Sequence, residues 1–158
     1  MSSIRIKLVD ESGFAGGAEA LPFGVLVFVI GGLLLANAWG VMDAKLAAYS
    51  AAREATRAYV ESPIPDYAIQ NAQQAAGEAI AGHGRNPSKM RLVTVNDASY
   101  TRCSPITFEV SYPVPTISLP WIKGPGVGSI TVRASHSELV DPYRDGVPAQ
   151  DGSETSCP

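Results

Sequence analysis

Residue types that build catalytic and metal sites are scarce in this sequence. The chain has two histidines and two cysteines in 158 residues. Neither His83 nor His136 has a nucleophile or a carboxylate at a diagnostic spacing. Cys103 and Cys157 form no CxxC pair and have no histidine at metal-ligand spacing. We therefore predict no catalytic, cofactor-binding or metal-binding residue, and we expect that the protein is not an enzyme.

Positive charge is scarce as well. Lys and Arg number 12 against 15 Asp and Glu, which gives a net charge of -3 and a pI near 5.3. Proteins that bind phosphate backbones usually carry a clustered basic footprint. Nucleic acid is therefore not an expected partner.

Charged residues are completely absent from Ala20 to Met42. A helix of this length crosses a hydrocarbon core of about 30 Å. Pro22 falls in the first turn of the expected helix, where its missing N–H is tolerated, and Trp39 falls near the far end, at headgroup depth. The sequence therefore predicts a single transmembrane helix, with the lipid bilayer as a partner.

The helical pattern continues beyond this apolar run. The segment from Asp43 to Glu61 is rich in Ala, Leu, Lys, Arg and Glu, and Pro63 is the first helix breaker after it. One helix over residues 19–61 would be on the order of 60 Å long. We expect its second half to stand clear of the bilayer as a stalk.

The segments on either side of residues 19–61 have a different character. Residues 1–18 read as a polar leader or cytoplasmic tail, in which glycines disfavour a helix. Residues 62–140 predict a head domain of the α+β class, and residues 141–158 predict a mostly disordered tail. In the head, a second helix from about Asp66 to Ala81 would pack on a small three-stranded antiparallel sheet. Its strands are expected at residues 91–96, 106–112 and 130–135, where apolar and polar residues alternate.

Two features of the apolar helix suggest contacts beyond lipid. Small residues with a spacing of about four allow close helix packing in membranes, although glycine is also simply common there. Glu19, at the edge of the run, is costly if submerged and is then usually paired or functional. Alternatively, it is a solvated residue that favours the helix dipole. The predicted assembly and helix-packing residues are Glu19, Gly24, Gly32, Ala36 and Gly40.

Several alternatives remain open at this point. Asn37 either bonds across a helix interface or lies at headgroup depth beside Trp39. Ala36-Asn37-Ala38 matches a signal-peptidase site, so cleavage there competes with a retained anchor. The loop Ile117–Ile122 is apolar enough to be the contact of an anchored or secreted binding module. Cys103 and Cys157 form one disulfide if the head lies in an oxidising compartment, or else are two unrelated thiols.

Two stretches resemble the TadE-like family of minor pilins and pseudopilins, from the tight-adherence (Flp pilus) machinery of bacteria. The first is Gly16-Gly17-Ala18-Glu19-Ala20-Leu21-Pro22, a small-residue run followed by a Glu that leads into the apolar helix. The second and more specific one is Ala51-Ala52-Arg53-Glu54-Ala55-Thr56-Arg57, which is similar to the family's Ala-Ala-Arg-Glu-Gly-Ala-Arg. The strand pair at residues 110–115 and 130–135 is similar to the family's C-terminal sheet.

The resemblance implies a structural subunit of a surface pilus or secretion apparatus. Such a subunit is held in the bacterial cytoplasmic membrane as a single-pass protein, with an extracytoplasmic C-terminal domain, and reaches the cell surface after assembly. The implied partners are other pilin or pseudopilin subunits, the assembly platform and a prepilin peptidase. Phe14 stands where processed members carry the glycine before the cut, so the candidate leader-cleavage residues are Gly13, Gly16 and Gly17.

Overall fold

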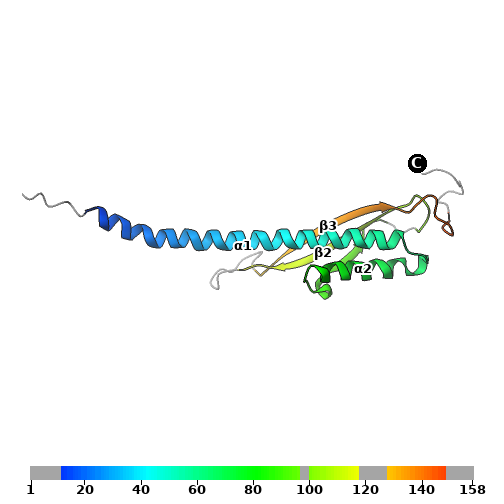
Figure 1. Ribbon diagram of the computed structural model, residues 1–158, viewed down its shortest axis with the longest axis horizontal. Coiled ribbons are helices and arrows are strands. Elements are labelled where there is room, and N and C mark those ends of the chain that lie inside the picture. The colour runs from blue at the N-terminus through cyan, green and yellow to red at the C-terminus, as the bar shows by residue number, and fades with distance from the viewer. Residues whose placement is uncertain (1–11, 97–99, 118–127, 149–158) are drawn as a thin grey trace, which may run out of the picture.

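The computed structural model describes residues 12–96, 100–117 and 128–148, with the side chains of residues 12–19 left out. One long helix, a second helix and a three-stranded sheet make up the described chain (Figure 1). The elements in chain order are α1 (Ser12–Val60), η1 (Pro65–Tyr67), α2 (Ala68–Gly82), η2 (Pro87–Lys89), β1 (Arg91–Thr94), β2 (Pro105–Pro115) and β3 (Ser129–Leu139).

Helix α1 is continuous over 49 residues, which corresponds to a length of about 70 Å. It begins at Ser12, seven residues before the expected start, so the predicted interruption at Gly13, Gly16 and Gly17 is corrected. Each glycine weakens a helix by about 1 kcal/mol but does not forbid its backbone angles. Pro22 consequently lies inside the helix rather than in its first turn.

The sheet has the order β1-β2-β3 and is antiparallel throughout. Leu92 pairs with Val110, and Val110 pairs on its other side with Ala134. These three residues lie on the face that packs against the helices. The opposite face carries polar pairs, including a hydrogen bond between the Thr107 and Ser137 hydroxyls. The predicted α+β fold, with a small three-stranded antiparallel sheet, is confirmed.

Both helices lie on the same side of the sheet, with α1 over β2 and β3 and α2 beside α1 (Figure 1). The second half of α1 is therefore not a bare stalk, because one of its faces is fully buried in the head. Sequence periodicity missed this role, since alanine contributes little to an apolar pattern. The buried alanines of this face are Ala44, Ala47, Ala48, Ala51, Ala52 and Ala55.

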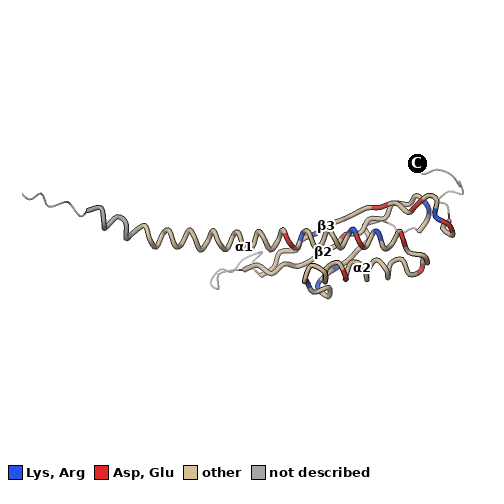
Figure 2. Tube along the Cα trace, viewed as in Figure 1, with Lys and Arg blue, Asp and Glu red and all other residues tan. Residues whose placement is uncertain are grey.

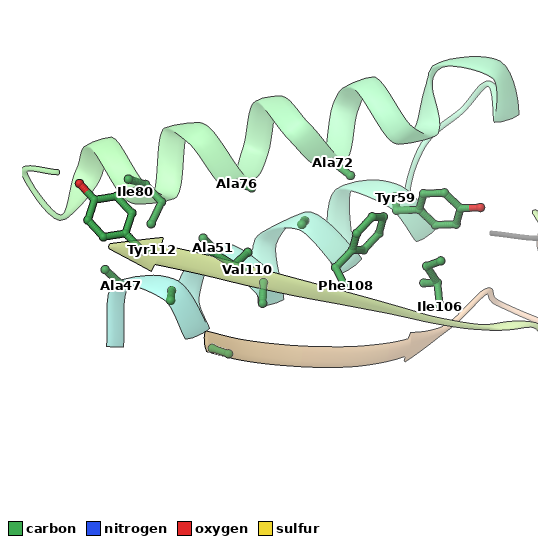
Figure 3. Close-up of a cluster of buried hydrophobic side chains, with 14 of the residues drawn as sticks. Ala47, Ala51, Tyr59, Ala72, Ala76, Ile80, Ile106, Phe108, Val110 and Tyr112 are labelled. Carbon is green, nitrogen blue, oxygen red and sulfur yellow. The ribbon is translucent and has the colours of Figure 1, made fainter. Parts of the chain in front are cut away.

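Larger side chains from β2 fill the space that the alanines leave. Figure 3 shows Phe108 beside Tyr59 of α1, and Ile80 of α2 close to Tyr112. The rings of Tyr59 and Phe108 lie 5.6 Å apart in an edge-to-face arrangement, a geometry that aromatic pairs favour. Small residues on the helices and large residues on the central strand thus produce one closely packed core.

The chain after β3 differs from the predicted disordered tail. Val147 is buried, and the N–H of Arg102 donates to the Pro148 carbonyl at 2.9 Å. Arg144 also donates hydrogen bonds to carbonyls at the end of α1. The prediction was wrong for residues 141–148, because a sequence rich in Pro, Gly and Asp hides one buried valine and one anchoring arginine. Residues 149–158 lie outside the described part of the chain.

Candidate functional site: the exposed apolar half of α1

The first half of α1 projects away from the head without contacts that would bury it. Its most apolar 18-residue window has a mean hydropathy of 2.2 and none of its residues buried. In Figure 2 this half carries no blue or red between Ala20 and Met42, and Asp43 is the first charged residue after this run. The helix is long and apolar enough to span a membrane or to act as a signal.

Over residues 20–36, exposed apolar side chains surround α1 on all sides. A helix that packs on a soluble core shows one apolar stripe and one polar face. Here large side chains at successive positions are exposed, from 44% for Val29 to 81% for Phe28. The exposed large residues are Leu21, Phe23, Val25, Leu26, Val27, Phe28, Val29, Ile30, Leu34, Leu35, Trp39 and Met42. Water is a poor solvent for such a surface, which requires an apolar environment on every side.

Polar contacts mark the point where the apolar half meets the head. Asp43 forms an ion pair with Arg85 from the end of α2, at 2.5 Å. The ammonium group of Lys45 donates to the Arg133 carbonyl on β3. From this level onward α1 has the charged and buried positions of a soluble helix, so its two halves are built for different surroundings.

Asn37 joins the apolar half of α1 to the end of the β2–β3 hairpin. Its side-chain amide donates to the Ile117 carbonyl at 2.9 Å, and its carbonyl oxygen accepts from the Ile117 N–H at 2.8 Å. The amide also donates to the Leu33 carbonyl at 2.9 Å. The structure gives Asn37 a partner that neither alternative named, because the amide bonds the hairpin of its own chain and not a neighbouring helix. Its position as the one amide in the apolar run was the available sequence signal.

The predicted helix-packing residues do not share one environment. A Cβ placed on Gly40 would lie 4.0 Å from Val114 of β2, so Gly40 faces the protein's own head. Nothing lies within 4 Å of a Cβ placed on Gly24 or Gly32, and Ala36 is exposed. At 100° per residue, Gly24 points about 160° away from Gly40. A packing role for Gly24, Gly32 and Ala36 stays a prediction.

Other predicted site residues fall at the margins of the described chain. Glu19, Gly13, Gly16 and Gly17 lie in the backbone of α1, but the Glu19 side chain is outside the described residues. Its role and the cleavage of a leader both stay predictions. Of the loop Ile117–Ile122, only Ile117 is described; its side chain is 58% exposed.

Cys103 lies in the turn before β2 with a positive φ of 64°. Its sulfur is not a free thiol. Cys157, the other cysteine of the sequence, lies outside the described residues. The pairing of the two cysteines therefore stays a prediction.

The histidines occupy separate places in the head. His136 on β3 meets the ring of Tyr49 edge-on, with 5.9 Å between centroids, while His83 follows the last turn of α2. Within residues 20–96, 100–117 and 128–148, no group of three His, Cys, Asp or Glu side chains is placed to hold a metal ion. These residues offer no geometry from which a reaction can be derived.

Taken together, the long apolar N-terminal helix, the second helix and the sheet packed against the helices define a pilin-like arrangement. Comparisons of the chain with protein-family models, with curated proteins and with solved structures found no match.

Proposed function

We propose that the protein is a structural subunit of a bacterial pilus or secretion apparatus, of the minor pilin or pseudopilin kind found in tight-adherence systems. It is anchored by α1 in the cytoplasmic membrane, with the head on the extracytoplasmic side. The observation that carries this proposal is the apolar half of α1, which is exposed on all sides and continuous with a packed head. Only lipid or other apolar helices can cover such a surface.

Assembly would exchange one apolar environment for another. In the bilayer, lipid chains surround the side chains of residues 20–36; in a filament, the same side chains would contact helices of neighbouring subunits. Hydrophobic transfer contributes little to this exchange, because lipid is as apolar as leucine. Close packing beside Gly24 and Gly32, together with pairing of the predicted Glu19 carboxylate, would instead favour the assembled state.

Retention of the anchor suits this function better than removal of a signal. Cleavage after Ala38 would separate Asn37 from the rest of the chain and leave the polar groups of Ile117 without their partner. The intact mass of the mature protein distinguishes a retained anchor from a cut near residues 13–17 and from a cut after Ala38.

Site-specific cross-linking in cells that assemble the filament tests the proposal. A photoreactive phenylalanine replaces Phe28, which is 81% exposed on the apolar half, or Tyr143, which is 84% exposed beyond the sheet. We expect position 28 to form cross-links to pilin subunits, and position 143 to serve as the matched control without them. The protein should also remain in the membrane fraction after a carbonate wash. Recovery in the soluble fraction, or cross-links to lipid alone at position 28, would contradict the proposal.

Glu19 provides a sharper test of the assembly role. Because it lies at the opposite end of α1 from the sheet, Glu19→Ala should leave the thermal transition of the head unchanged while reducing incorporation into the filament. Glu19→Asp is the control, since it keeps the carboxylate. If Glu19→Ala is incorporated as well as the unmodified protein, Glu19 has no role beyond an ordinary position near the start of the helix.

A further inference from the structure

We propose that the end of the β2–β3 hairpin is a membrane-contacting surface that lies at the boundary between lipid headgroups and acyl chains. The surface, here called the hairpin foot, consists of residues 114–117 and 128–130. The inference rests on the proposed membrane anchor and adds a second contact to it: the head does not stand above the bilayer but is seated on it. The evidence is the position of the foot along α1, its satisfied backbone and its exposed side chains.

The hairpin foot lies alongside the apolar half of α1, below the first charged residues. Its contact with Asn37 is six residues before Asp43, or about 9 Å along the helix axis. Val114 lies beside Gly40, with its side chain 4.0 Å from the position that a Cβ on Gly40 would occupy. If α1 enters a membrane up to this level, the hairpin foot therefore lies at the same depth as the helix beside it.

Backbone polar groups of the foot are paired inside the protein. Asn37 bonds both the N–H and the C=O of Ile117. The Thr116 N–H donates to the Gly128 carbonyl at 3.2 Å, and the Gly128 N–H donates to the Thr116 hydroxyl at 3.0 Å. Non-helical backbone is tolerated near the hydrocarbon only when such groups are satisfied within the protein. The foot meets this condition at the contacts described.

Large apolar side chains are exposed at this level on both elements, beside the small exposed Ser129 of the hairpin. Ile117 and Ile130 of the hairpin are 58% and 42% exposed, and Trp39 and Met42 of α1 are 75% and 64% exposed. Tryptophan favours the headgroup level, because its ring is apolar and its N–H needs a polar partner. A bilayer boundary near Trp39 places Ile117 at that same boundary.

Helix length distinguishes a seated head from a raised one. The uncharged run of α1 is about 34 Å long, close to the hydrocarbon thickness of about 30 Å. About 20 residues cross this thickness, so a span that begins at Ala20 ends near Trp39 and brings the level of Asn37, and so the foot, to the boundary of the hydrocarbon. Holding the foot in water would require a span of about 20 residues that ends at Ala36. This span would begin near Gly17 and would bring Glu19 inside the edge of the hydrocarbon, where a carboxylate is disfavoured. Seating the foot avoids that placement.

Depth measurements on spin labels in a bilayer test the inference. The full chain is placed in nanodiscs of phosphatidylcholine and phosphatidylglycerol, with a nitroxide on a cysteine introduced by Ile117→Cys, Leu26→Cys or Ser135→Cys. Leu26 marks the anchor, and Ser135 marks an exposed part of β3 about 20 Å from Ser129. If the parent chain takes up label, its native cysteines are replaced by serine in all variants.

We expect the label at position 117 to report the same lipid environment as the label at position 26. Both labels should be relaxed more by oxygen than by a water-soluble nickel complex, and the label at position 135 should show the reverse. A label at 117 that behaves like the one at 135, while 26 is in lipid, would overturn the seated head and leave the anchor intact. A label at 26 in water would instead overturn the proposed membrane function, and the seated head with it.

The role of Asn37 is tested in the same system. Asn37→Ala removes the partner of the Ile117 backbone, and it should move the label at 117 toward water and increase its mobility. Leu35→Ala is the control, because Leu35 is 73% exposed and its loss leaves the Asn37–Ile117 hydrogen bonds in place. An unchanged depth in the Asn37→Ala protein would show that Asn37 does not hold the foot at the membrane.

Discussion

Arg144 closes the end of α1 and ties the last described segment of the chain to it. Its guanidinium donates to the carbonyls of Val60, Glu61 and Ser62, the last two at 2.8 and 2.6 Å. The final carbonyls of a helix have no partner within the helix, so each needs an external donor. The guanidinium also lies over the ring of Tyr100, 5.9 Å from its centroid. One residue thus satisfies several groups at once.

Arg144→Ala should destabilise the head by about 1.5–3 kcal/mol, because the carbonyls lose a charged hydrogen-bond donor. Thermal unfolding of the detergent-solubilised protein measures the effect. Arg57→Ala is the control: its ion pair with Glu61 joins side chains that are 59% and 62% exposed, and such pairs contribute about 0.5 kcal/mol or less. Equal losses in the two variants would contradict a special role for Arg144.

Tyr59 and Tyr100 give the head a pH dependence on the alkaline side. Burial raises the pKa of both phenols above their ordinary value of 10.0, and for Tyr100 the nearby Arg144 opposes the increase. The folded state therefore keeps these protons at a pH where the unfolded state has lost them. The unfolded state then binds fewer protons, so the free energy of unfolding falls as pH rises above about 10.

Tyr100→Phe should make this alkaline loss of stability smaller. The Tyr100 hydroxyl donates to the Ser62 carbonyl at 2.5 Å, so the variant should also be less stable at neutral pH. Chemical unfolding measured from pH 7 to 11 separates the two effects. Tyr143→Phe is the control, because that ring is 84% exposed, and its pH profile should match the unmodified protein. If the free energy of unfolding of Tyr100→Phe falls with pH as steeply as that of the control, Tyr100 does not contribute to the alkaline loss of stability.

At the scale of elements, alanine sets the distance between α1, α2 and the sheet. The contact faces of both helices consist largely of alanines with 0% exposure, among them Ala51 on α1 and Ala72 and Ala76 on α2. Figure 3 shows Ala51 and Ala76 in the space between the two helices and β2. Because such an interior is close-packed, added side-chain volume forces the elements apart.

Ala51→Leu should therefore lower the free energy of unfolding of the head by about 1–3 kcal/mol, the usual cost of overpacking a core. The control is Ala81→Leu, which adds the same atoms at an exposed position of α2. Thermal unfolding of both proteins in detergent gives the comparison. If Ala51→Leu is as stable as its control, the small side chain at position 51 does not set the spacing between the helices and the sheet.

Sequence reasoning recovered the elements more completely than their contacts. Alternating residues identified β2 and β3, and the uncharged run identified the apolar half of α1, because periodicity and composition are local properties. The contacts of Asn37 with Ile117 and of Arg144 with Ser62 join residues that are far apart in the chain. Their sequence positions carry no sign of each other. The start of α1 was missed for a different reason, because glycine weakens a helix without ending it.

At the scale of the whole molecule, the predicted Cys103–Cys157 disulfide would tie the C-terminal end of the chain to the start of β2. Closing a loop of some 50 residues stabilises a protein by roughly 3–4 kcal/mol in the chain-entropy model. Reduction should therefore lower the thermal transition of the head, and a chain with both cysteines replaced by serine should not respond to reductant. Labelling of both thiols in the native, unreduced protein would contradict the pairing.

Because α1 is continuous from Ser12 to Val60, a rotation of its apolar part about the helix axis also rotates the head. No linker separates the exposed apolar part of the helix from the part that packs against the sheet. In the proposed filament, the direction in which the head points around the filament axis would follow from which side of residues 20–36 packs inward. Each residue inserted after Val27 would turn the head by about 100° and raise it by about 1.5 Å, whereas seven would return it to within about 20° of its original bearing. In that filament, the length of α1 would set the angular position of each head.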